Sequence, residues 1–160
     1  MFKSKMVEIL SKAEVFEGLT RDDLKTIAKH CKKIGFEKGD ILIGIDREPP
    51  GFFILINGKV RVVLPERMTG RREKRASEIS LNVLTEGDCF GEYSLIEKTR
   101  TSAAVVGKES GEVLKIPKEN FDQIMNDNQM AKTIYRNMLH ILIKRLRRKE
   151  NELDLVLLAS

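Results

Sequence analysis

The spacing of apolar residues predicts helices at the N-terminal end of the chain. Residues three, four and seven positions apart share one face of a helix, and the chain has apolar residues at this spacing: Leu24, Ile27, Ala28 and Cys31. Just before them, Thr20 and Asp23 have the Thr-x-x-Asp spacing that is typical of a helix start. We expect a shorter helix around Val7, Leu10 and Ala13 to precede this one.

After Lys33 the pattern changes to that of short strands. Gly39-Asp40 reads as a turn, and the apolar segment 41–43 follows it. The stretch FFILINGKVRVVL contains two strand-like segments joined by Asn57-Gly58. Because this dipeptide favours the tight turn whose twist suits two antiparallel strands, we predict a β-hairpin here.

Further strand signals follow a polar loop of mixed charge at residues 65–78. Apolar and polar residues alternate over 79–83, and segments 101–106 and 112–116 read as strands separated by a turn at Ser110-Gly111. Many short strands with regular turn signals are typical of a compact sandwich or barrel. We therefore predict a mainly β fold in the middle of the chain.

The last part of the chain is predicted to be helical. Pro117 suits the first turn of a helix, and a long helix is expected over about residues 130–157. The length of 160 residues suggests one domain. We divide it into a β-roll with flanking helices, residues 1–128, and a long C-terminal lid or dimerisation helix of the same domain, residues 129–160.

Residues in the last helix, all apolar except Lys149, form a seam with alternating spacings of three and four: Leu139, Leu142, Leu146, Lys149, Leu153 and Val156, widened by Ile143 and Leu157. Such a heptad pattern is typical of paired helices. The alternative is a helix packed on its own roll, which we expect for the first half. For the second half we predict a homodimer through two paired helices.

Charge and cysteine content narrow the class of protein. The net charge is +5, and residues 131–151 carry seven basic side chains against one acidic one. A basic helix can contact nucleic acid or an acidic partner, but a solvated helix face is the interpretation we favour. Cys31 and Cys89 form no spaced motif, and no apolar run approaches 18 residues. We therefore expect a cytoplasmic protein that does not span a membrane.

The sequence contains no constellation of catalytic residues. His30 and His140 are the two histidines, and neither belongs to a metal-binding HxH or HExxH motif. A GxxxxGK[ST] phosphate loop and a GxSxG nucleophile elbow are also missing from the sequence. We predict that the protein is not an enzyme and holds no metal.

The stretch CFGEYSLIEKTRTSAAVV places a glycine, a carboxylate and an arginine around one short turn. A turn beginning at Glu92 would present backbone N–H groups to an anion. Arg100 could meet a phosphate with two parallel hydrogen bonds, and Glu92 could accept from a sugar hydroxyl. The residues therefore suit a ribose phosphate. The alternative from composition alone is an exposed Arg100 and a Glu92 that only begins a helix.

The order FGEYSLI, followed by R-T-S-A, resembles the phosphate-binding cassette of the cyclic nucleotide-binding domain family. This family includes bacterial catabolite activators, regulatory subunits of cyclic-AMP-dependent kinase and cyclic-nucleotide-gated channels. EVFEGLTRDDLKTIAKHC, FEKGDILI, FFILINGKVRVV and LTEGDCFGE resemble its other parts. The resemblance implies an eight-stranded antiparallel β-roll, a jelly-roll-like double-stranded β-helix, flanked by N-terminal helices and a long C-terminal helix.

The resemblance also implies a set of ligand-binding residues. Glu92 would bond the 2′-hydroxyl of the sugar, Arg100 would bind the phosphate, and Lys149 to Asn151 would lie near the base. The full set comprises Phe90, Gly91, Glu92, Tyr93, Ser94, Arg100, Thr101 and Ser102.

Two alignments compete within this set. Family members place the arginine nine or ten residues after the glutamate, whereas Arg100 comes eight after Glu92. A shortened turn keeps Arg100 in the pocket, and this is the alignment that we favour. An ungapped alignment instead puts Thr101 at the arginine position and leaves the phosphate without its charged partner.

We therefore predict a cytoplasmic regulatory sensor that binds a cyclic nucleotide and relays binding through its C-terminal helices. Cyclic AMP is the first candidate ligand and cyclic GMP the second. The predicted partners are a second copy of the chain and a downstream protein of unknown identity. The alternative is a degenerate cassette without a nucleotide, kept as a dimerising or protein-interaction scaffold.

Overall fold

A computed structural model describes residues 2–64 and 79–160, so the predicted polar loop at 65–78 lies outside the described residues. The helices before the sheet are α1 (Phe2–Ser11), the 3-10 helix η1 (Glu14–Phe16) and α2 (Arg21–Ala28). The described strands are β1 (Lys32–Phe36), β2 (Ile41–Ile43), β3 (Gly51–Leu64), β4 (Ile79–Leu84), β5 (Cys89–Phe90) and β6 (Ala104–Pro117). The remaining helices are α3 (Glu92–Glu97), α4 (Lys118–Met125) and α5 (Asn128–Ala159).

The predicted start of α2 is confirmed by a capping box. The Thr20 hydroxyl accepts from the backbone N–H of Asp23 at 3.1 Å, and the Asp23 carboxylate accepts from the backbone N–H of Thr20 at 3.0 Å. These two bonds satisfy donors that a helix start would otherwise leave unpaired. Leu24, Ile27 and Ala28 are buried, as their spacing predicted, but Cys31, which was predicted on the same face, lies beyond the end of α2.

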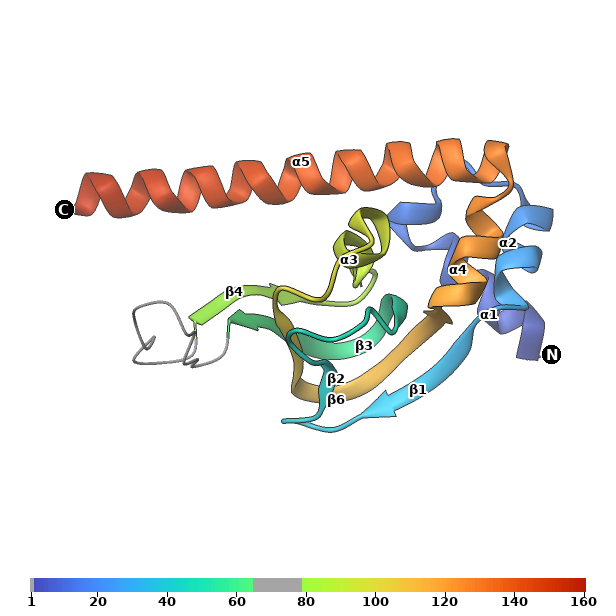
Figure 1. Ribbon diagram of the computed structural model, residues 1–160, viewed down its shortest axis with the longest axis horizontal. Helices are drawn as coiled ribbons and strands as arrows, with labels where there is room; N and C mark the ends of the chain where they lie inside the picture. The colour runs from blue at the N-terminus through green and yellow to red at the C-terminus, as the bar shows by residue number, and fades with distance from the viewer. Residues whose placement is uncertain (1, 65–78) are drawn as a thin grey trace.

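Strands β3 and β6 are the two central strands of the antiparallel sheet. They pair along almost their whole lengths, from Gly51 opposite Pro117 to Val63 opposite Ala104. Strands β1 and β2 add to β6, whereas β4 and β5 add to β3. The result is a curved roll with α1, α2 and α4 gathered at one end and α5 running along its length beyond α3 (Figure 1).

The predicted hairpin turns at Asn57-Gly58 and Ser110-Gly111 were wrong. Both dipeptides lie inside continuous strands and face each other where the register of β3 and β6 shifts. A Cβ added to Gly111 would lie 2.1 Å from the Asn57 carbonyl oxygen, so only glycine lets the two backbones approach this closely. The sequence signal for a turn therefore marks a β-bulge at a corner of the roll.

These two uninterrupted strands also account for the difference in strand number. The resemblance implied eight strands, whereas the sheet has six in the described part of the chain. Strands β3 and β6 each contain two segments that were expected to be separate. Strand β1 was not predicted, because its residues are mostly exposed and show no alternation.

Two clusters of buried side chains hold the fold together. The larger one joins the terminal helices to one side of the sheet, with Phe52 packed between Phe16 and Phe121. The smaller one fills the inside of the roll, where the rings of Phe53 and Phe90 stack with centroids 4.9 Å apart.

Helix α5 has three parts with different surroundings. Its first part is buried in the larger cluster through Met130, Ala131, Ile134, Met138 and Ile141. Asn137 anchors this part by donating to the carbonyl oxygens of Val15 and Glu17 at 2.9 and 2.8 Å. The middle part passes over the roll, and residues from Glu150 onward are exposed. Among the described residues, no helix is both long and apolar enough to cross a bilayer.

Candidate functional site

A cavity of about 470 Å³ lies between the middle of α5 and the inside of the roll. This volume is in the range of small-molecule sites. The roof consists of α5 side chains: Leu142, Arg145, Leu146 and Lys149. Much of the rest of the wall is apolar and comes from the strands and the loop before β3: Ile43, Pro49, Pro50, Val62, Leu81, Leu84, Phe90 and Val105.

Gly91 turns the chain from β5 into α3 and so aims Glu92 at the cavity. Its φ of 89° is in the left-handed region, and a Cβ there would lie 2.6 Å from the Gly51 carbonyl oxygen. Glu92 then begins α3, the short helical turn predicted at this place. Its side chain is almost completely buried at the cavity wall.

Arg145 of α5 reaches across the cavity to Glu92. Its Nη1 lies 2.9 Å from Glu92 Oε1 and 3.4 Å from the Tyr93 hydroxyl, while its Nη2 donates to the Cys89 carbonyl oxygen. Burial raises the pKa of Glu92 above its ordinary value, and the positive charge of Arg145 opposes this rise. Burial alone would lower the pKa of Arg145, but the neighbouring Glu92 carboxylate contributes to a net rise, so the guanidinium stays charged.

Thr101 lies on the wall of the cavity and is fixed by the loop before β3. Its hydroxyl donates to the Gly44 carbonyl oxygen at 2.6 Å and accepts from the Arg47 N–H at 2.9 Å. Two backbone bonds flank it: Thr101 N–H donates to the Arg47 carbonyl at 2.9 Å, and Asp46 N–H donates to the Thr101 carbonyl at 2.8 Å. These four bonds fix the register of Thr101 against this loop.

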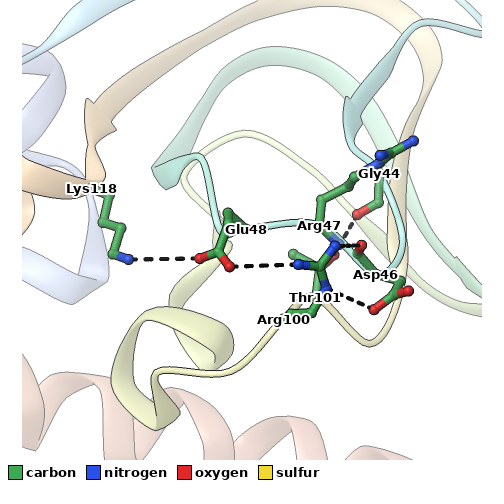
Figure 2. A network of polar contacts seen from close by, with 7 residues as sticks. All are labelled: Gly44, Asp46, Arg47, Glu48, Arg100, Thr101 and Lys118. Carbon is green, nitrogen blue, oxygen red and sulfur yellow. Dashed lines mark hydrogen bonds and ion pairs between the residues drawn. The ribbon is translucent and has the colours of Figure 1, made fainter.

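Arg100 lies on the outer side of the same segment. Its Nε donates to Asp46 Oδ1 at 2.9 Å, its Nη2 donates to the Asp46 carbonyl, and its Nη1 lies 3.6 Å from Glu48. Figure 2 shows Arg100 between Asp46 and Glu48, with Lys118 on the other side of Glu48 at 3.9 Å. The Arg100 side chain remains half exposed and does not line the cavity.

The structure brings most of the predicted site residues to one cavity. Its wall includes seven of the eight: Phe90, Gly91, Glu92, Tyr93, Ser94, Thr101 and Ser102. Arg100 is the exception, because Thr101 lines the cavity and Arg100 does not. A phosphate contact by Arg100 stays a prediction. Lys149 lies on the wall, whereas Glu150 and Asn151 are not part of it.

Sequence reasoning missed the role of Arg145, which it counted only as one charge of a basic helix. A signal was available, because residues three and four apart share a helix face. Arg145 is three residues after Leu142 and four before Lys149, so all three point the same way. Pro49, Pro50 and Asn82 were also missed, since nothing local connects them to the cassette.

Comparison with protein families identifies the class. Residues 33–128 match the cyclic nucleotide-binding domain, and the chain belongs to this family. It is 28% identical over 153 residues to the CRP-like cAMP-activated global transcriptional regulator of Mycobacterium tuberculosis, covering 94% of this chain and 63% of the regulator. It is 27% identical over 133 residues to the cGMP-dependent protein kinase egl-4 of Caenorhabditis elegans. That match covers 82% of this chain and 16% of the kinase, so the chain spans only part of these relatives.

Solved structures show the same fold. The regulatory subunit of a cAMP-independent protein kinase A from Trypanosoma brucei aligns with a TM-score of 0.75, 18% identity, and coverage of 95% of this chain and 52% of that one. The Trypanosoma cruzi counterpart, bound to guanosine, aligns with a TM-score of 0.70 and 19% identity. The alignment covers 84% of this chain and 45% of that one. A T. brucei variant with three substitutions, one of them threonine to arginine, is bound to cAMP and aligns with a TM-score of 0.71 and 18% identity. The alignment covers 94% of this chain and 51% of that one.

Proposed function

We propose that the chain is a regulatory sensor domain in which a small ligand of the cyclic-nucleotide class binds under α5 and controls how α5 docks. The observation that carries this proposal is the contact between Arg145 on α5 and Glu92 on the cassette. The family resemblance supports a contact between Glu92 and the sugar of the ligand, so in this proposal ligand and helix meet at one carboxylate. No catalytic step is part of this function.

The cavity supports a coupling between binding and the position of α5. A ligand shifts an equilibrium only by binding one arrangement better than the other. In the docked arrangement Leu142 and Leu146 of α5 roof the cavity, and they would cover apolar parts of the ligand. A sugar hydroxyl that donates to Glu92 would share the carboxylate with Arg145. The ligand therefore favours the docked helix.

Cyclic AMP is the ligand that we predict from the sequence, with cyclic GMP as the second candidate. In this form of the proposal Phe90, Gly91, Tyr93, Ser94 and Ser102 surround the sugar and phosphate. Either Arg100 leaves Asp46 to reach the phosphate or Thr101 meets it with a neutral hydroxyl. Both thiols are free, which supports the cytoplasmic location that we propose.

Hydrogen exchange tests the sensor function. We expect a bound ligand to slow amide exchange in residues 142–149 of the wild type. The Arg145→Met variant should lose most of this ligand-dependent protection, whereas the matched variant Arg147→Met, at an exposed position on the same helix, should keep it. A ligand that binds in the cavity without changing exchange in α5 would contradict the relay.

A specific surface favours a second function, that of a dimerising scaffold. The end of α5 exposes five large apolar side chains, each at least 60% accessible: Leu153, Leu155, Val156, Leu157 and Leu158. Exposed apolar surface of this kind marks interaction sites. We propose that a second copy of the chain covers it through the seam residues Leu153 and Val156. The downstream protein would then bind to the two paired helices.

A further inference from the structure

Among the described residues, the cavity wall offers no positively charged side chain that lacks an ion-pair partner. Two cationic side chains line the cavity, Arg145 and Lys149. Arg145 is bonded to the Glu92 carboxylate and to the Cys89 carbonyl, and Lys149 pairs with Glu152 at 2.9 Å. A ligand phosphate would therefore have to break an existing ion pair to gain a charged partner.

Arg100 is held away from the cavity by the register of its own segment. Bringing it to the position of Thr101 requires a shift by one residue against the loop at 44–47. That shift would break the four hydrogen bonds that Thr101 and Asp46 make there, and also the contacts of Arg100 with Asp46. These bonds together oppose the shift.

The same geometry penalises an anionic ligand and favours a neutral one. A cyclic nucleotide carries one negative charge on its phosphate, and an uncompensated charge is costly to bury beside apolar walls and next to Glu92. A neutral ligand avoids this cost. The cavity wall includes the Glu92 carboxylate, which can accept hydrogen bonds, and three further polar residues: Ser94, Ser102 and Asn82.

Resting on the proposed function, we infer that this cavity takes an uncharged purine nucleoside in preference to its cyclic monophosphate. Sugar hydroxyls donate to Glu92, which Arg145 holds in place. The flat base lies against the apolar roof of Leu142 and Leu146. Thr101 fills the place of the phosphate-binding arginine with a neutral side chain whose hydroxyl is already bonded.

Calorimetric titration of the full chain tests this inference. The protein is first unfolded and refolded to remove any carried ligand, and its thermal unfolding is recorded to show that it is native. Adenosine, guanosine and inosine are then compared with cyclic AMP and cyclic GMP. We expect at least one nucleoside to bind about tenfold or more tightly than its cyclic monophosphate.

Two variants make the test specific. Thr101→Arg should reverse the preference by at least about tenfold toward the cyclic nucleotide, because it supplies the missing charge. Arg100→Ala, at a half-exposed position, should leave nucleoside affinity unchanged within about twofold. If Thr101→Arg does not fold, the inference is still tested by the wild-type affinities for nucleosides and cyclic nucleotides and by the nucleoside affinity of Arg100→Ala.

The outcomes separate the inference from the proposed function. Tighter binding of cyclic AMP or cyclic GMP to the wild type, lost in Arg100→Ala, would overturn the inference and leave the sensor function in place. Native protein that gives no heat and no thermal shift with any of the five compounds would overturn both. Nucleoside binding without protection of α5 would support the ligand class and contradict only the relay.

Discussion

Arg145 and Glu92, 53 residues apart in sequence, are joined by a 2.9 Å contact, and their side chains are only 13% and 3% exposed. Arg145 belongs to α5 and Glu92 begins α3, so the pair connects the helix over the cavity to the cassette beneath it. A buried ion pair adds little net stability compared with apolar residues, but losing one partner leaves an uncompensated charge. The position of α5 therefore depends on whether the Glu92 carboxylate is charged and free to pair with Arg145.

Removing Arg145 should destabilise the protein. We expect Arg145→Met to lower the free energy of unfolding by about 3 kcal/mol, because Glu92 is then buried without its cation. Adding Glu92→Gln should recover a large part of this loss, since the leftover charge is removed. Urea unfolding of both single variants and the double variant measures the coupling. Arg147→Met is the control and should stay within about 0.5 kcal/mol of the wild type. If Arg145→Met and Arg147→Met lowered the free energy of unfolding equally, the ion pair between Arg145 and Glu92 would not contribute as expected.

Titration of the Glu92 carboxyl should contribute to the pH dependence of the free energy of unfolding. Burial raises the pKa of its carboxyl in the folded state, so the folded protein holds this proton more firmly than the unfolded chain. The free energy of unfolding therefore falls as pH rises from the ordinary carboxyl range through the raised pKa. Relative to Glu92→Gln, the wild type should lose stability as pH rises above the ordinary carboxyl range.

The same series in Arg145→Met should show a larger loss, because the cation that opposes the rise in pKa is gone. Denaturant midpoints measured at matched ionic strength provide the comparison. A wild-type stability that tracks Glu92→Gln at every pH would show that the carboxyl titrates normally.

Local signals were sufficient for the starts of α2, α3 and α4. The capping box at Thr20 and Asp23, the glycine before Glu92 and the proline before α4 each act within a few residues of the helix that they begin. The predicted long helix matches α5 closely for the same reason, since helix periodicity is visible in the sequence itself.

Long-range pairing is what the sequence could not show. Asn-Gly and Ser-Gly suit a hairpin turn, but they equally suit a bulge, and the choice depends on the partner strand. Here Asn57 pairs with Glu112, 55 residues away. The sequence favoured Arg100 over Thr101 at the pocket for the same reason: the loop at 44–47, which holds Thr101 at the cavity wall, lies more than 50 residues from Thr101 in the sequence.

Gly58, at the corner of the roll, and Gly87 have nearly the same positive φ but are expected to respond differently to substitution. Gly58 has φ 81° and Gly87 has φ 87°, but a Cβ at Gly58 would lie 2.6 Å from the Ser110 carbonyl oxygen, whereas at Gly87 nothing lies within 4 Å. Gly87→Ala should cost about 1 to 2 kcal/mol for the left-handed conformation alone. Gly58→Ala should cost at least about 2 kcal/mol more, because the backbones of β3 and β6 must separate. Chemical unfolding measures both, and equal losses would show that the close approach is unimportant.

The exposed end of α5 predicts a change in oligomeric state. Leu153 and Val156 are 60% and 65% exposed and continue the face on which Leu142 and Lys149 line the cavity. Since two copies can bury these residues against each other, we expect the wild type to be a dimer at micromolar concentration. Leu153→Lys with Val156→Lys should weaken the dimer at least about a hundredfold, because both substitutions place charges in the seam.

The control for this prediction is Asn151→Lys, which adds a charge on another face of the same helix turn. It should leave the dimer intact, as measured by sedimentation equilibrium. Ligand affinity should be unchanged in all of these variants, because the substituted residues lie outside the cavity wall. A wild type that sediments as a monomer would contradict the dimer.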